Sequence, residues 1–153
     1  MSALFEVSGL GVGFGGTGVV EDVALKLGAG EALGVVGESG SGKSVSALAP
    51  WGLLSGATVR GSARFAGEEL VGASEARLRA LRGSGVGFIF QDPMAALNPA
   101  LRVGEQVTES LRVHQSMGSR ERRARAVELL TRVGVPSPEL RVDAWPHELS
   151  GGL

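Results

Sequence analysis

The sequence predicts an α/β fold built around a glycine-rich loop, and three observations support this prediction. An apolar run at residues 32–36 is followed by a glycine- and serine-rich run at 37–44 and then by a potentially helical stretch at 45–49. Most of the 25 glycines lie in the first 90 residues, a distribution typical of short strands joined by tight turns. Beyond residue 98, apolar residues recur at helical spacing instead.

The first strands follow from alternating apolar and polar residues. Residues 4–7 and 19–27 alternate in this way, and the glycines within 28–30 predict a turn before the apolar run at 32–36. Residues 59–65 predict a further strand, which ends at a turn formed by Ala66 and Gly67.

The next segment predicts one short helix and one buried strand. Ser74 is a suitable N-cap for a helix through residue 81, and Gly83 is a suitable end. Residues 86–90 form a compact apolar run, which predicts a buried strand. Pro50 removes one helical hydrogen bond and predicts a kink after the glycine-rich loop.

The last third of the sequence predicts helices. Val103, Val107 and Leu111 recur at four-residue intervals, and Ser119 is a candidate cap for a second helix that Gly134 would end. One apolar face of that second helix would be formed by Ala126, Leu129, Leu130 and Val133. The arginines at 120, 122, 123 and 125 would form a mostly solvated face, with a dedicated anion or partner site as the alternative.

The glycine-rich run matches the phosphate-binding pattern G-x-x-x-x-G-K-[ST]. The residues that match it, all candidates for nucleotide binding, are Gly37, Glu38, Ser39, Gly40, Ser41, Gly42, Lys43 and Ser44. Backbone N–H groups of such a loop surround an anion, the lysine neutralises β- and γ-phosphates, and the final hydroxyl ligates Mg²⁺. Glu38 occupies an unspecified position, so it is expected to contribute its backbone rather than act as an acid. The alternative is a flexible linker that matches by accident.

Composition excludes several classes of protein. Apolar residues make up 43% and charged residues 20% of the chain, as in soluble globular proteins. A net charge of −1 gives no reason to expect a nucleic-acid partner, and the absence of cysteine excludes disulfides and thiolate metal sites. His114 and His147 lack the companions of a metal site and are expected at the surface or at helix ends. No signal peptide or membrane span is recognisable, so a cytosolic location is expected.

Three further stretches point to one family. Residues 88–93 read F-I-F-Q-D-P, residues 149–152 read L-S-G-G, and Phe14 lies 29 residues before Lys43. With the glycine-rich loop, these stretches resemble the nucleotide-binding domain of ABC transporters. Within that family, the sequence is most similar to ATPase subunits of oligopeptide, dipeptide and nickel importers. The stretches that carry this similarity are G-E-S-G-S-G-K-S, I-F-Q-D-P-M-A-A-L-N-P and W-P-H-E-L-S-G-G.

The resemblance implies roles for individual residues. Gln91 would be the Q-loop residue that senses water and Mg²⁺, and Ser44 with Gln91 would form the metal site. Phe14 would stack on adenine, although an aromatic residue in a strand also suits a core position. The signature motif, which would grip the γ-phosphate of a partner subunit's ATP, comprises Leu149, Ser150, Gly151 and Gly152. Taken alone, Gln91 suits an ordinary polar loop and S-G-G an ordinary turn.

The resemblance also implies a division of the chain as a single, incomplete nucleotide-binding domain. Residues 1–30 and 59–70 would form an antiparallel β subdomain, residues 31–58 and 71–96 the ATP-binding core, and residues 97–153 a helical subdomain that ends at the signature. The family pattern continues with an Asp-Glu strand (Walker B and catalytic Glu) and a switch histidine, which these residues do not include. The C-terminal part of the core sheet would therefore be missing, and the apolar runs at 32–36 and 86–90 would be left exposed.

The function implied is an energy-coupling ATPase subunit of an importer for peptides or related solutes, with ATP and Mg²⁺ as cofactors. Its partners would be transmembrane permease subunits, a second identical or different ATPase subunit, and indirectly a solute-binding protein, at the cytoplasmic face of the membrane. One alternative is a non-catalytic nucleotide-binding fragment. Another is an unrelated P-loop enzyme such as a small-molecule kinase.

Overall fold

The computed structural model describes residues 3–90, 96–115 and 117–150. It divides the chain into two units, Met1–Arg82 and Gly83–Leu153, each of which has its own core. Among the described residues, no helix combines the length and the apolar character needed to cross a membrane.

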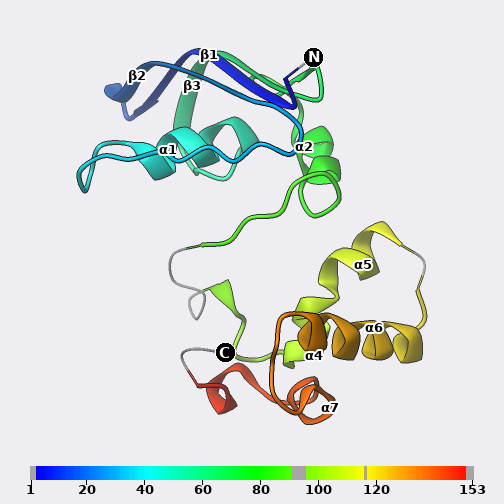
Figure 1. The fold of residues 1–153 in the computed structure, drawn as a ribbon. Coiled ribbons are helices and arrows are strands. Elements are labelled where there is room, and N and C mark those ends of the chain that lie inside the picture. Colours follow the sequence, from blue (N-terminus) through cyan, green and yellow to red (C-terminus); the bar gives the residue numbers. More distant parts are fainter. Residues whose placement is uncertain (1–2, 91–95, 116, 151–153) are drawn as a thin grey trace. The chain divides into compact units, whose positions relative to one another are not determined.

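The first unit contains a four-stranded antiparallel sheet with the order β2-β1-β3-β4 (Figure 1). Its strands are β1 (Phe5–Phe14), β2 (Thr17–Leu27), β3 (Ala57–Phe65) and β4 (Glu68–Glu69). The three predicted strands at 4–7, 19–27 and 59–65 are confirmed, although β1 and β2 are longer than expected because they form one hairpin. The predicted turn after β3 is also confirmed, with Ala66 and Gly67 at positive φ.

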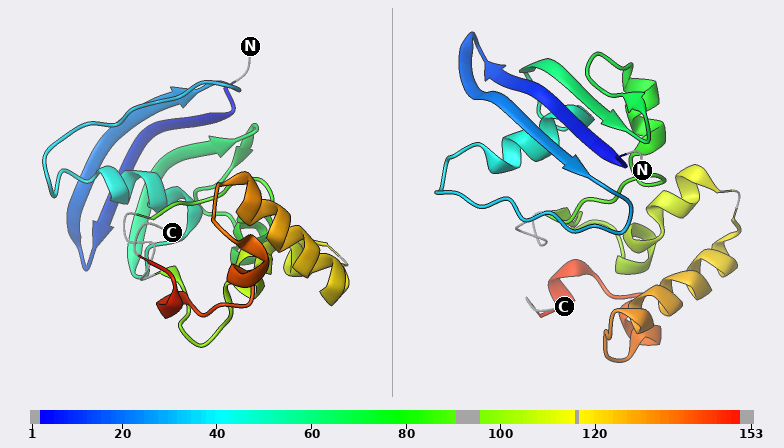
Figure 2. Two further views of the ribbon diagram at one scale, coloured as in Figure 1. Left: turned by 60° about the horizontal axis from the view of Figure 1, so that its bottom comes forward. Right: turned by 45° about the horizontal axis from the view of Figure 1, so that its top comes forward.

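One face of this sheet carries the core of the unit. Helix α1 (Lys43–Leu48) and the 3₁₀ turn η1 (Ala49–Trp51) lie against it (Figures 1 and 2). Trp51 is 4% exposed, and its ring centroid lies 5.6 Å from that of Phe5 and 5.4 Å from that of Phe65. Aromatic pairs at these distances add attraction beyond simple burial. A kink was expected at Pro50; instead α1 ends at Leu48 and Pro50, which has no N–H to donate, lies in the 3₁₀ turn that follows.

Helix α2 (Glu75–Leu81) completes the first unit and matches its prediction. The side chain of Ser74 accepts a hydrogen bond from the backbone N–H of Arg77, which caps the helix. The chain leaves the helix through Gly83, whose φ is +83°.

The predicted strands at 32–36 and 86–90 are wrong. Residues 31–38 belong to no helix or strand, and only Val86 of the second run forms a bridge. Val36 is 94% and Ile89 101% exposed. Both runs have strand-like composition, but a strand needs a neighbour for its N–H and C=O groups. Residues 32–36 pair with no strand among the described residues, and the second run has only the isolated bridge at Val86, whose carbonyl accepts a hydrogen bond from the N–H of Gly83. The expected exposure of these apolar runs is confirmed.

The second unit is helical. It contains α4 (Val103–Val107), α5 (Glu109–His114), α6 (Ser119–Arg132), α7 (Pro138–Arg141) and the 3₁₀ turn η2 (Pro146–Glu148). Its core is formed by Val103, Ala126, Leu130 and Val142, with Leu149 packed against them. Backbone N–H groups of Val103 and Gly104 donate to the carbonyls of Ala144 and Val142. These hydrogen bonds hold the segment after α7 against the start of α4.

Three details of this unit differ from the sequence prediction. The helical run through Leu111 is divided at Thr108, whose buried hydroxyl donates to the carbonyl of Gly104 at 2.7 Å. Gly118 rather than Ser119 is the N-cap of α6, so the hydroxyl caps nothing. Val133 is 77% exposed because the helix has ended there, whereas the stop at Gly134 is confirmed.

A carboxylate network joins β3 to β4 and predicts acid sensitivity. Glu69 accepts hydrogen bonds from Ser62 Oγ at 2.5 Å and from the backbone N–H groups of Ala63 and Val71 at 2.9 and 3.1 Å. Burial raises the pKa of Glu69. These hydrogen bonds, with a weaker one from Arg64, lower the pKa by more than burial raises it, so that it falls from 4.5 to about 2. Because the pKa is depressed in the folded state, the stabilisation is complete above about pH 5 and is lost as the pH falls toward 2.

Replacing Glu69 by glutamine is therefore expected to lower the free energy of unfolding at pH 7 and to flatten its decline between pH 5 and pH 2. A shift of this size corresponds to about 3 kcal/mol, but the side chain is 38% exposed, so solvent screening reduces the expected loss to about 1–2 kcal/mol. Urea unfolding at pH 7 and pH 3 measures it. Glu6→Gln is the matched control, since Glu6 is 39% exposed and its one ion pair among the described residues is with Lys26. Equal pH dependence in Glu69→Gln and the unmodified chain would contradict the assignment.

Candidate nucleotide-binding site

The glycine-rich loop joins the unpaired segment 31–36 to α1. Gly40 and Gly42 have φ values of +80° and +86°, which L-residues with side chains rarely adopt. A Cβ atom at Gly42 would also lie 2.7 Å from Cγ2 of Val20, so β2 packs directly on the loop. Both requirements explain why glycine stands before Lys43.

Lys43 turns back over this loop. Its Nζ donates to the carbonyl oxygens of Gly37 at 2.9 Å and Glu38 at 2.7 Å, and to the hydroxyl of Ser41 at 3.3 Å. The ammonium is thus held at the centre of the loop by groups that the loop itself supplies. The Lys43 ammonium forms no ion pair with the described residues, so its positive charge on this loop is suited to a polyphosphate.

The loop is closed by the first turn of α1. Ser41 N–H donates to the carbonyl of Glu38, and both the N–H and the hydroxyl of Ser46 donate to the carbonyl of Gly42. Ser44 is exposed, and its hydroxyl forms no hydrogen bond with the described residues. It fits the role of a Mg²⁺ ligand, because a hard cation prefers an oxygen that is still free to coordinate.

Phe14 lies at the end of β1, half buried, opposite Thr17 of β2 and Ala57 of β3. It belongs to the same hairpin as Val20, the residue that contacts the loop at Gly42. The sheet therefore brings Phe14 and the loop into one unit, and its role in base stacking stays a prediction.

The signature residues lie in the second unit. Leu149 is half buried against the helical core, and Ser150, which follows it, is exposed. Gln91, Gly151 and Gly152 lie outside the described residues. His114 and His147 are exposed, the first in the last turn of α5 and the second in η2, as expected.

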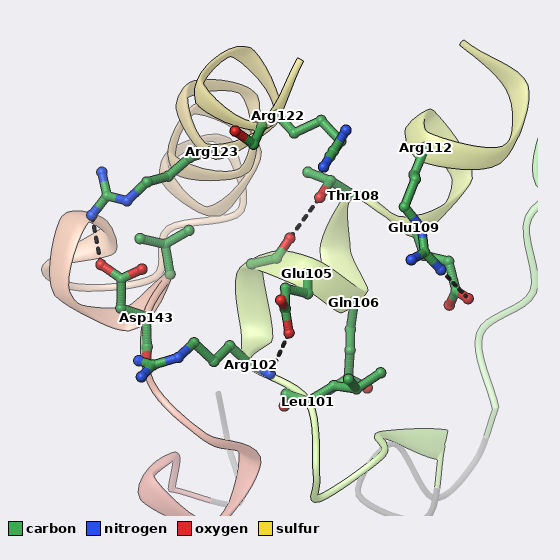
Figure 3. Close-up of a pocket in the computed structure, with 13 residues that line it drawn as sticks. Leu101, Arg102, Glu105, Gln106, Thr108, Glu109, Arg112, Arg122, Arg123 and Asp143 are labelled. Carbon is green, nitrogen blue, oxygen red and sulfur yellow. Dashed lines mark hydrogen bonds and ion pairs between the residues drawn. The ribbon is translucent and has the colours of Figure 1, made fainter. Parts of the chain in front are cut away.

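A pocket of about 310 Å³ in the second unit was not anticipated from the sequence (Figure 3). Its walls come from α4, the first turns of α5 and α6, and the segment after α7. Arg123 pairs with Asp143 at 2.6 Å, and Arg112 with Glu109 at 3.7 Å. The hydrogen bond from Arg123, strengthened by its charge, lowers the pKa of Asp143.

Two ion pairs thus lie in the lining of this pocket, whereas Arg122 donates to the backbone carbonyl of Met117. The guanidinium of Arg102 donates to the Asp143 carbonyl and lies 5.1 Å from the centre of the Trp145 ring. Contacts of this kind stabilise the packing of the helices in the second unit, and we assign the pocket no ligand. The arginines of α6 agree with a mostly solvated face, since Arg123 and Arg125 form exposed ion pairs.

Comparison with known proteins places the chain in a family. The family model described as ABC transporter matches residues 20–153. The chain therefore belongs to the ABC transporter family. It is 45% identical to the dipeptide transport ATP-binding protein DppD of Escherichia coli over 157 residues, which cover 99% of this chain and 48% of that protein. It is 47% identical to the oligopeptide transport ATP-binding protein OppD of Mycobacterium tuberculosis, covering 99% of this chain and 26% of that protein.

Solved structures agree with this assignment. The dimeric ATP-binding cassette MJ0796, bound to ADP and Pi, has a TM-score of 0.82 and 25% sequence identity, covering 97% of this chain and 64% of that one. The predicted fold class is therefore confirmed. The chain spans about half the length or less of the curated relatives named above.

Proposed function

We propose that residues 37–44 bind the triphosphate of Mg·ATP and that the chain is the nucleotide-binding part of an energy-coupling subunit of a peptide importer. The observation that carries the proposal is the position of the Lys43 ammonium, 2.9 Å from the Gly37 carbonyl and 2.7 Å from the Glu38 carbonyl, over a loop with two positive-φ glycines. Family membership and the peptide-import names of relatives support it.

The residues present fit both cofactors. Lys43 would neutralise the charge on the β- and γ-phosphates, and backbone N–H groups between Gly37 and Ser44 would contact their oxygens. Ser44 would hold Mg²⁺, together with Gln91. Mg²⁺ would supply charge neutralisation between the phosphates. Phe14 would hold the adenine ring by stacking.

Hydrolysis and transport are proposed for a protein of the relatives' full length, since these residues make up only about half of it. In that protein Leu149, Ser150, Gly151 and Gly152 would contact the ATP held by a second ATPase subunit. Permease subunits, and through them a solute-binding protein, would be its further partners at the cytoplasmic face of the membrane. For residues 1–153 themselves, we propose nucleotide binding.

Titration of the ¹⁵N-labelled chain with Mg·ATP tests the proposed binding. Amide resonances of residues 37–46 are expected to shift and saturate at micromolar nucleotide, while those of α6 stay in place. Mg·AMP is the control ligand because it has the base and ribose but lacks the β- and γ-phosphates. The proposal would be overturned if the chain is folded but the amide resonances of residues 37–46 do not shift in millimolar Mg·ATP.

A further inference from the structure

The side chain of Ser41 contacts the ammonium at the centre of the loop. An ammonium group has three N–H donors and no acceptor. Lys43 directs them at the Gly37 carbonyl, the Glu38 carbonyl and the Ser41 hydroxyl, at 2.9, 2.7 and 3.3 Å. The three acceptors match the capacity of the ammonium, and the hydroxyl is the only side chain among them.

Gly37 leaves the space that this hydroxyl occupies. Its φ is not among the positive values, so backbone conformation does not require glycine there. A Cβ atom at position 37 would lie 2.7 Å from Ser41 Oγ, but 3.5 Å from Ser41 Cβ and 3.8 Å from Lys43 Cδ. An alanine at 37 would therefore displace the hydroxyl and little else.

We propose that Ser41 is a positioning residue: its hydroxyl holds the Lys43 ammonium over the loop before the phosphates arrive, and Gly37 is glycine to leave room for it. The inference rests on the proposed function of the loop. Without Ser41 Oγ, the lysine side chain would lose its alignment and would have to be ordered by the ligand, which lowers affinity.

The nucleotide-free chain provides a direct test. The chain has two lysines, so the ¹H–¹⁵N spectrum of its side-chain ammonium groups contains two sites, and Lys26 is an internal reference paired with Glu6. Ser41→Ala is expected to shift the Lys43 signal and to speed its hydrogen exchange about three- to tenfold, leaving Lys26 unchanged. Ser41→Thr, which keeps the hydroxyl, should restore the original signal. A Lys43 signal that is the same in Ser41→Ala would overturn the proposal.

A double-mutant cycle on Mg·ATP affinity tests the link to Gly37. Gly37→Ala and Ser41→Ala are each expected to weaken binding about three- to tenfold, and the double variant no more than either one, because both remove the same contact. Gly34→Ala is the matched control, since a Cβ there meets nothing within 4 Å, and it should bind as the unmodified chain does. Multiplying effects in the double variant would overturn the proposal.

The two experiments separate this inference from the proposed function. The ammonium spectrum needs no nucleotide, so it still tests the contact if the chain fails to bind Mg·ATP. Conversely, normal binding with an unaltered Lys43 signal in Ser41→Ala would overturn only the role of Ser41. Far-ultraviolet circular dichroism of each variant establishes that the fold is retained.

Discussion

Replacing Lys43 by alanine is expected to weaken the binding of Mg·ATP about a hundredfold, or about 3 kcal/mol. The ammonium lies over the loop within hydrogen-bond distance of the Gly37 and Glu38 carbonyls, which fixes its charge at the place proposed for the phosphates. Charge-assisted contacts to phosphate are among the stronger hydrogen bonds in proteins, and alanine removes both the charge and the donors. Isothermal titration calorimetry of the two chains measures the difference.

Lys26→Ala is the control for this prediction because it removes the same charge from the same unit. Lys26 is 72% exposed and pairs only with Glu6 among the described residues, so its loss should change neither nucleotide affinity nor stability by more than about 0.5 kcal/mol. If folded Lys43→Ala bound Mg·ATP as tightly as Lys26→Ala, the phosphate site could not be centred on Lys43.

The largest expected effect on stability is that of Gly61→Ala in β3. Gly61 has a φ of +90°, and a Cβ atom there would lie 2.2 Å from the carbonyl oxygen of Gly9 and 2.9 Å from that of Ser8. Both are backbone atoms of the neighbouring strand β1 and have no rotamer to change. Strain at positive φ costs about 1–3 kcal/mol, and overpacking costs about as much again, so the expected loss is about 4 kcal/mol. That is most of the stability of many small domains.

Gly67→Ala separates the two causes. Gly67 has a φ of +84°, but a Cβ atom there would meet nothing within 4 Å, so only the conformational cost of about 1 kcal/mol should appear. Urea unfolding followed by Trp51 emission, in a Trp145→Phe background, reports the first unit alone. Equal losses at the two positions would show that the backbone clash with β1 is absent.

Gly61 also illustrates how far sequence periodicity can describe this sheet. The pairing of β1 and β3 is irregular between Ser8 and Gly11, so Val7 and Leu10, three residues apart, are both buried. Strict alternation would place them on opposite faces. A bulge restores them to one face, and glycines at positive φ permit it. Alternation therefore located the strands but could not assign every side chain to a face.

The candidate site was predictable to a similar degree. The pattern at residues 37–44 identifies the loop, and two of its glycines have the positive φ that the pattern implies. The contact of Val20 with Gly42 joins residues far apart in the sequence, and no local pattern indicates it. The use of the Ser41 side chain was missed for another reason, since a phosphate loop tolerates many residues at that position.

The sequence alone determined the phosphate-binding loop at residues 37–44, because binding a polyphosphate requires particular residues at fixed spacing. Its resemblance to ABC transporter ATPase subunits indicated the family, which the family model then confirmed. Only the tertiary structure decided which apolar runs become strands. Residues 57–65 found a partner in β1, whereas residues 32–36 have no neighbour among the described residues and stay unpaired. The physical reason is that a strand is stabilised by hydrogen bonds to another segment, so its formation depends on what lies beside it and not on its own composition.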